Sequence, residues 1–207
     1  MIKQNITPII QGFLKISDPI TKEVLVEKSN AINYENISIA MANTLSNQLN
    51  TGWIYSMAFG NGGTIVDPTG VITYLTPNTI GTNSTLYNET YVKVVDDTSV
   101  FNLDPTRNKM TVSHTTGKVY TDILVQCLLD YGEPSGQAAF DNSTQTNSSY
   151  IFDELGLLAN YGTDTNGNVV TRLLTHVIFH PVLKSLNRLI QIDYTVRIQS
   201  LTGLVGV

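Results

Sequence analysis

A cluster of glycines follows a strand-like segment and is the first place in the sequence where chemistry could be expected. Gly60-Asn61-Gly62-Gly63 looks like the start of a phosphate-binding loop. A dinucleotide site, however, needs the pattern G-x-G-x-x-G followed by a helix, whereas Pro68 and Gly70 follow here. The P-loop pattern is also missing around Gly117-Lys118, because no glycine stands at the required position upstream. We therefore expect residues 60–63 to form a tight or bulged loop that uses the access of glycine to positive φ, or that approaches a neighbouring subunit closely.

Two histidines, His176 and His180, are separated by three residues in the segment HVIFH. On a helix this spacing suits a metal site, but the intervening valine, isoleucine and phenylalanine favour a strand. On a strand the two side chains would be about 13 Å apart at ~3.3 Å per residue, which is too far to share one ion. His114 is distant in sequence and precedes a turn. We therefore expect packed or interface histidines, with no metal.

Adjacent carboxylates occur at Asp96-Asp97 and at Asp153-Glu154, and paired carboxylates can carry out acid–base catalysis. Neighbouring residues of a strand point to opposite faces, so neither pair is expected to converge. Glu154 precedes the apolar run LGLL, and we expect it to be partly buried and paired with Arg172 on the adjacent strand. A hydrolase that uses Glu154 is therefore the least favoured function, and we expect no catalytic residues.

Cys127 lies on the apolar face of an expected strand, without a basic neighbour that would lower the pKa of its thiol. We expect it to be inert packing. The segment DTNGN at 164–168 resembles half of a calcium loop, but Leu174 and Thr175 stand where the final glutamate is needed. We interpret this segment as a hairpin turn around Asn166-Gly167.

The composition limits the classes of partner. The chain has 207 residues, a net charge of −5 and only 14% charged residues, against roughly 25% in an average soluble domain. The acidic balance and the absence of basic runs argue against a nucleic-acid partner. The single cysteine, and the absence of a signal-like start and of an apolar run near the ~20 residues that cross a bilayer, predict folding in a reducing cytoplasm without a membrane partner.

Alternation of apolar and polar residues dominates the sequence and indicates half-buried strands. The alternation is clearest in the segments 190–199 and 119–131. Asp18-Pro19 predicts a turn between two N-terminal strands. The segment 53–59 is predicted to be a strand whose one face carries Trp53, Tyr55, Met57 and Phe59.

A helix is predicted over about residues 34–50, where apolar residues recur at every fourth position. These residues are Ile37, Met41, Leu45 and Leu49. Asn33 can cap the start of this helix and Gly52 its end.

Two long segments, 76–90 and 132–149, lack periodicity and are rich in Asn, Thr, Ser, Gly and Pro. We expect them to be extended loops that act as interaction arms. No repeat or linker divides the chain. The sequence therefore predicts one domain over residues 1–207, a mainly β, antiparallel β-sandwich with one α-helix in its N-terminal half.

Several short sequence blocks follow one another in a definite order. They are Asn30-Ala31-Ile32, the FGNGGT block at 59–64, the ELGL block at 154–157, and a block that includes Phe179, Pro181 and Lys184 through Ile198. This order resembles a group of virion structural proteins of tailed bacteriophages, in which such a block, a helix and FGNGGT precede a strand-rich C-terminal half. The resemblance covers most of the chain. It implies a β-sandwich subunit packed into a particle, without catalytic residues.

We therefore expect a non-enzymatic, homo-oligomeric subunit of a tailed-phage virion, attached to capsid, neck or tail, made in the host cytoplasm and working without a cofactor. Its expected partners are copies of itself and other virion proteins. The candidate interface residues are Gly60, Asn61, Gly62, Gly63, Tyr87, Tyr91, Phe140 and His180. The alternative is a carbohydrate-binding β-sandwich for attachment to a host surface. That function requires aromatic side chains on one exposed face, whereas Trp53 is expected to face the core.

Overall fold

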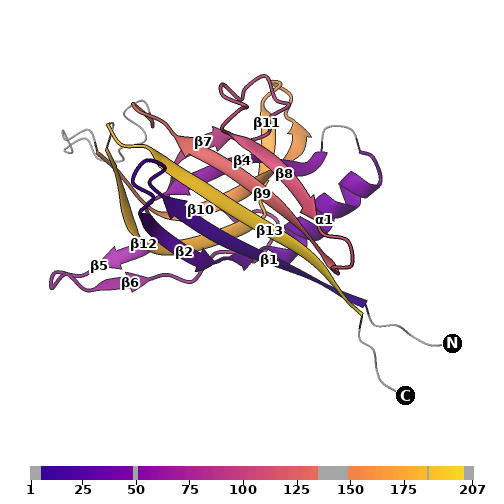
Figure 1. The fold of residues 1–207 in the computed structure, drawn as a ribbon, viewed down its shortest axis with the longest axis horizontal. Helices are drawn as coiled ribbons and strands as arrows, with labels where there is room; N and C mark the ends of the chain where they lie inside the picture. The colour runs from indigo at the N-terminus through magenta and orange to yellow at the C-terminus, as the bar shows by residue number, and fades with distance from the viewer. Residues whose placement is uncertain (1–5, 49–50, 135–148, 186, 203–207) are drawn as a thin grey trace, which may run out of the picture.

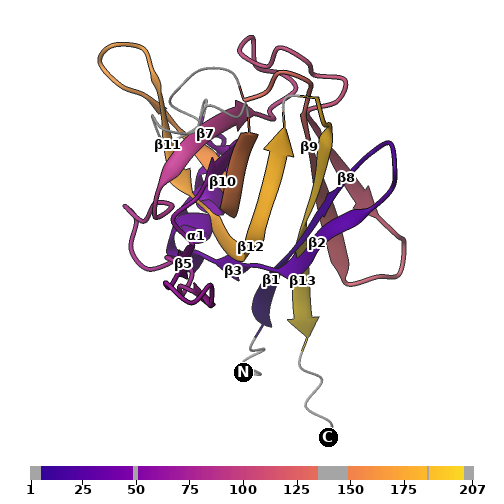
Figure 2. The ribbon, with the colours of Figure 1, turned by 90° about the vertical axis from the view of Figure 1, so that its left-hand side faces the viewer.

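The structure is a computed structural model that describes residues 6–48, 51–134, 149–185 and 187–202. Its fold is mainly β, with two antiparallel sheets that face each other and one helix among the described residues (Figure 2). The first sheet has the strand order β2 (Val24–Ser29), β1 (Ile6–Ser17), β13 (Ile190–Thr202), β9 (Tyr120–Leu129) and β8 (Lys109–His114). The predicted antiparallel β-sandwich is therefore confirmed.

The second sheet packs against the first and carries most of the residues discussed below. Its strand order is β3 (Ala31–Ile32), β12 (Thr175–Ser185), β10 (Ser149–Thr163), β4 (Thr51–Gly60) and β7 (Glu89–Val94), with β11 (Val169–Leu173) also paired to β10. A separate two-stranded sheet consists of β5 (Thr64–Val66) and β6 (Ile72–Tyr74). It leaves the lower left of the sandwich in Figure 1.

The core lies between the two large sheets, as the alternation of residues predicts. On β13, Ile192 and Tyr194 have no exposed surface, while Asp193 between them is partly exposed. The second sheet contributes a group of aromatic rings, in which Phe152 meets Phe59 and Phe179 edge to face at 5.4 and 5.8 Å. Each fully buried side chain of this size stabilises the fold by roughly 1.5–3 kcal/mol.

Both predicted hairpin turns are present. At the first, Asp18 Oδ1 accepts hydrogen bonds from the backbone N–H groups of Ile20 and Thr21, which closes the turn between β1 and β2. At the second, Asp164 Oδ1 accepts from the N–H groups of Asn166 and Asn168 between β10 and β11. Short polar side chains thus satisfy the backbone where the strands reverse.

The helix α1 (Tyr34–Leu45) is shorter than predicted. Asn33 caps its start, because its side chain accepts the backbone N–H of Asn36 at 3.1 Å. The predicted end at Gly52 is wrong. The helix ends at Ser46, after which Asn47 takes a left-handed conformation with φ of 54°, and Gly52 lies in β4.

The buried face of α1 also differs from the predicted stripe. Asn36, Ile37 and Ala40 are buried, whereas Leu45 is 84% exposed. Leu49 lies outside the described residues. Ile37 of the predicted stripe is buried and Met41 packs partly buried against the core, so the spacing of four residues predicts the packed face of the first two turns and fails at Leu45.

The predicted face of strand 53–59 is wrong in its first half, because β4 contains a β-bulge at Tyr55. Leu158 of β10 pairs with Ser56, and the next residue of β10 pairs with Ile54, so Tyr55 is the extra residue. Before the bulge, the residues of β4 that face the core are therefore the opposite set from the predicted one. Met57 and Ile54 face the main core, and the partly exposed Trp53 does not belong to it.

The segment 76–90 is irregular up to residue 88 and then enters β7. It packs on its own sheet, and its expected contact with a neighbouring subunit stays a prediction. Leu86 is buried in a small second cluster with Ala58, Leu158 and Leu173. Residues 135–148, most of the other predicted loop (132–149), lie outside the described residues. No helix in the described ranges has the length and apolar character needed to cross a bilayer.

Candidate functional site

The glycine loop (residues 60–63) connects β4 to β5 and lies against the Asp153-Glu154 pair of β10. Strand pairing places Glu154 directly beside Gly60. The pair of carboxylates and the glycine loop, far apart in sequence, therefore form one cluster, which His176 of β12 and the segment 76–88 complete. We call this cluster the carboxylate hub.

Glu154 is the centre of the hub and accepts four hydrogen bonds. Its Oε1 accepts the backbone N–H groups of Gly62 at 3.1 Å and Asn88 at 2.8 Å. Its Oε2 accepts the backbone N–H of Tyr87 at 2.9 Å and the ring of His176 at 2.9 Å. One side chain therefore holds the glycine loop and the end of the 76–88 segment in place.

The tautomer of His176 follows from its two partners. Its Nδ1 lies 2.8 Å from the backbone nitrogen of Asn78, which can only donate, so Nδ1 is an acceptor without a proton. The remaining ring proton is therefore on Nε2 and is donated to Glu154. His176 thus links the start of the 76–88 segment to the hub.

Burial and hydrogen bonding act in opposite directions on the pKa of Glu154. The side chain has no exposed surface, and burial by itself raises the pKa of a carboxyl group. The hydrogen bonds from His176, Asn88, Tyr87 and Gly62 outweigh burial and hold the pKa of Glu154 below its ordinary value. Glu154 is therefore a buried carboxylate whose negative charge is stabilised by hydrogen-bond donors rather than by a cationic side chain.

Asp153, the neighbour of Glu154 on β10, fixes the start of β5. It accepts the backbone N–H groups of Gly63 and Thr64, each at 2.9 Å, and the hydroxyl of Thr64. Burial raises the pKa of Asp153, and the nearby charge of Glu154 raises it further, against the lowering effect of these hydrogen bonds. The two carboxylates thus hold successive parts of one loop.

Glycine is required in this loop because of close approach, not because of positive φ. None of Gly60, Gly62 and Gly63 has a positive φ, so that part of the expectation is wrong. A Cβ on Gly60 would lie 2.4 Å from the carbonyl oxygen of Asn88 and 2.5 Å from Glu154 Oε1. The expected bulge is present, because the pairing of β4 with β7 shifts at Gly60. The loop approaches its own chain and leaves no room for a side chain.

The expected pair of Glu154 with Arg172 is also wrong. Arg172 stacks on the ring of Tyr161, with its guanidinium carbon 4.5 Å from the ring centre. Arg172 lies on β11, which pairs with the second half of β10, whereas the partner of Glu154 comes from β12, which pairs with the first half of β10. The register of β12 against β10 decides this partner, and no residue spacing indicates it.

The projecting ribbon β5–β6 begins directly after the hub, and we call residues 64–74 the arm. Its base is closed by a hydrogen bond from the N–H of Leu75 to the carbonyl of Gly63 at 2.9 Å. Its apolar side chains are largely uncovered: Ile65, Val66 and Val71 are 56–58% exposed. The hub therefore fixes the direction in which an apolar ribbon leaves the body.

The predicted interface residues fall into three groups. The glycine-loop residues Gly60, Asn61, Gly62 and Gly63 contact their own chain. Tyr87 and His180 are exposed near the arm, with His180 Nδ1 at 3.4 Å from the hydroxyl of Tyr74. Tyr91 packs partly buried against Phe59, and Phe140 lies outside the described residues.

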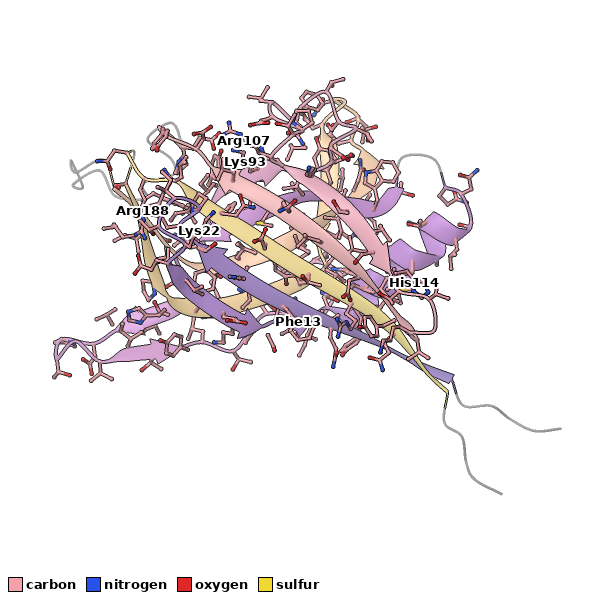
Figure 3. The ribbon with its side chains drawn as sticks, in the orientation of Figure 1. Phe13, Lys22, Lys93, Arg107, His114 and Arg188 are labelled. Atoms are coloured by element: carbon pink, nitrogen blue, oxygen red, sulfur yellow. The ribbon has the colours of Figure 1, made fainter. Side chains whose placement is uncertain are left out.

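The remaining reactive residues lie apart from the hub. His114, at the end of β8, is on the far side of the molecule from the arm (Figure 3). Cys127 is fully buried, and burial raises the pKa of its thiol to about 12. Within the described ranges no three His, Cys, Asp or Glu side chains gather as ligands for a metal ion.

Sequence reasoning missed the polar residues of the 76–88 segment and of α1 that complete the cluster. Asn33 Nδ2 donates to the carbonyl of Gly81 at 3.0 Å and to the hydroxyl of Ser84 at 2.6 Å. Asn36 Nδ2 donates to the carbonyl of Leu173 at 2.8 Å. The abundance of Asn was the only signal, because most of the partners are backbone groups that leave no pattern in the sequence.

Comparisons of the chain with protein-family models, with curated proteins and with solved structures found no match.

Proposed function

We propose that this chain is a non-enzymatic structural subunit of a tailed-phage virion, attached to capsid, neck or tail. It works through contacts with copies of itself and with other virion proteins. The observation that carries the proposal is the arm, a ribbon that leaves the body (Figure 1) and whose apolar side chains are largely uncovered.

An isolated two-stranded ribbon is marginally stable in water, and its unpaired edges invite another chain. In the arm, β5 and β6 pair only with each other among the described strands. Ile65, Val66 and Val71 add exposed apolar surface on a strand pair that carries a single charge, at Asp67. Such a surface is typical of a contact that a neighbouring molecule covers.

The hub supports a structural function for the most reactive residues of the chain. Glu154 and His176 have no exposed surface, and the carboxylate already accepts four hydrogen bonds. A general acid or base must reach the proton that it transfers. In the hub, these groups instead position the arm and the 76–88 segment, which is the role that an assembly subunit requires.

The low charge of the chain supports the same proposal. With 14% charged residues and a net charge of −5, copies of the chain repel one another weakly at short range. Neighbouring subunits therefore pack without desolvating many charged side chains, which is the costly part of forming an interface.

Replacing Val66 by Asp tests the role of the arm. The side chain is 58% exposed, so the subunit is expected to fold, while a charge on the arm opposes its burial against a neighbour. Val119→Asp is the matched control, because Val119 is also 58% exposed but lies outside the arm. The wild type and the control are expected to form oligomers in light scattering, and Val66→Asp is expected to have the mass of one chain. A Val66→Asp protein that assembles like the wild type would refute the function of the arm.

A further inference from the structure

The bulge in β4 creates a second feature that the assembly function does not use. Trp53 and Tyr55 leave the core and line a pocket of about 390 Å³ on the outer side of the second sheet. The loop between β7 and β8 contributes Asp96 and Phe101, and β10 contributes Asn160. None of the residues that line the pocket belongs to the arm, so the pocket and the arm are separate.

Aromatic surface is the first component of this pocket. Trp53 is partly exposed, and Phe101 is 66% exposed on the adjacent loop. The indole N–H of Trp53 donates to Asp96 Oδ2 at 2.9 Å, which fixes the plane of the ring. The faces of aromatic rings carry partial negative charge and pack favourably against C–H groups. The pocket therefore offers a preorganised flat apolar surface, not a flexible one.

Unused hydrogen-bonding groups are the second component. Asn160 is only 8% exposed; its Oδ1 accepts the N–H of Gly162 at 2.8 Å, and its Nδ2 has no partner among the described residues. Asp96 Oδ1 accepts two hydrogen bonds from Thr98, whereas Oδ2 accepts only that of Trp53. The site therefore has two free donors and a free acceptor position on nearly buried side chains.

We propose that this pocket binds one ring of a neutral saccharide. A sugar ring has an apolar face of C–H groups for Trp53 and Phe101, and hydroxyls that both donate and accept for Asn160 and Asp96. The volume lies within the range of small-molecule sites, near its lower end. Asp96 is the one charged residue in the lining, so an anionic sugar is repelled. The binding goes beyond the assembly function and does not depend on it.

Trp53 is the only tryptophan of the chain, so its fluorescence reports on this pocket alone. The probes are glucose, galactose, mannose, N-acetylglucosamine and N-acetylgalactosamine, with glucuronate and choline as an anionic and a cationic comparison. Ligand-detected NMR on the same samples detects any sugar that binds without changing the fluorescence emission of Trp53. At least one neutral sugar is expected to bind, with a change in Trp53 emission.

Two variants and a matched control locate the binding. Asn160→Asp keeps an acceptor for Gly162 but loses both free donors, and Phe101→Ala removes an exposed ring. Each is expected to weaken binding at least about fivefold, the effect of one lost hydrogen bond or a comparable contact. Leu103→Ala, on the same loop and 96% exposed, is expected to bind like the wild type. The proposal is overturned if no neutral sugar binds, if only glucuronate or choline binds, or if both variants bind as tightly as the control.

Discussion

At Glu154, a single carboxylate organises two stretches of backbone that are far apart in sequence. Four donors surround it, and three of them are backbone N–H groups from the glycine loop and from the end of the 76–88 segment. A buried anion is tolerated at this position because the donors replace the water that it loses. The residue therefore acts as a cross-link between loops.

Glu154→Gln is the most conservative test of this cross-link. The substituted amide keeps the shape of the side chain, but its NH₂ group faces donors, so at least one buried N–H loses its acceptor. We expect a loss of about 2–4 kcal/mol in the free energy of unfolding, measured by denaturant titration.

The exposed Glu27 provides a control for the loss of charge alone. Glu27→Gln is expected to change the free energy of unfolding by less than about 0.5 kcal/mol. If Glu154→Gln falls within the same range, Glu154 is not the organising residue of the hub.

The pH dependence of stability has a definite sign at this residue. Because the pKa of Glu154 is lowered in the folded protein, its contribution is fully present above the unfolded pKa of about 4.3 and is lost as the pH falls through the folded pKa. Asp153, whose pKa is raised, contributes with the opposite sign: the stability that it provides when protonated is lost as the pH rises through its folded pKa.

The difference in unfolding free energy between the wild type and Glu154→Gln isolates the first of these effects. We expect this difference to be constant above about pH 5 and to decrease below about pH 4. The measurement is a series of denaturant titrations from neutral to acidic pH. A difference that increases on acidification would show that the sign is wrong.

At the scale of elements, the sequence predicts those features that depend on local patterns. The alternation in β13, the turns at Asp18 and Asn166, and the Asn33 cap all follow from side chains acting on nearby backbone. The bulge at Tyr55 does not follow, because it is set by the pairing of β4 with a strand 100 residues later in the chain.

The candidate site shows the same division. Glu154 in front of an apolar run is a signal of a buried acid, and the glycines are a signal of close approach. The sequence cannot show that the two signals meet, because their meeting depends on strand register. The choice of His176 over Arg172 also depends on strand register, because β12 pairs with β10 at Glu154, whereas Arg172 of β11 pairs at Ala159.

Two glycine substitutions, one in the glycine loop and one in the arm, distinguish the cost of close packing from the cost of a positive φ. Gly60→Ala places a methyl group against backbone and is expected to destabilise the fold by about 2–4 kcal/mol. Gly70, at the tip of the arm, has open space around it but a φ of +86°, so Gly70→Ala is expected to cost about 1 kcal/mol. Thermal or denaturant unfolding gives both values. Equal costs, or a larger cost at Gly70, would contradict the close packing of the glycine loop.

At the scale of the whole molecule, the blocks that suggested phage virion proteins lie mainly at buried positions. Phe59 and Phe179 belong to the core, and Glu154 is the centre of the hub. Lys184 is fully buried and donates to the carbonyls of Asp130 and Ser185, and burial lowers its pKa to about 8. These blocks therefore specify the fold and the direction of the arm, while most of the surface that we propose as a contact with neighbours lies elsewhere in the sequence.

The central proposal, that the chain is a subunit of a tailed-phage virion, is tested most directly by quantitative mass spectrometry of phage particles purified from a culture that produces the chain. The account predicts that peptides of this chain are present in a fixed ratio to the major capsid protein, at several copies per particle, and remain after the particles are washed at high salt. Peptides found in the infected-cell lysate but absent from the particles would contradict it.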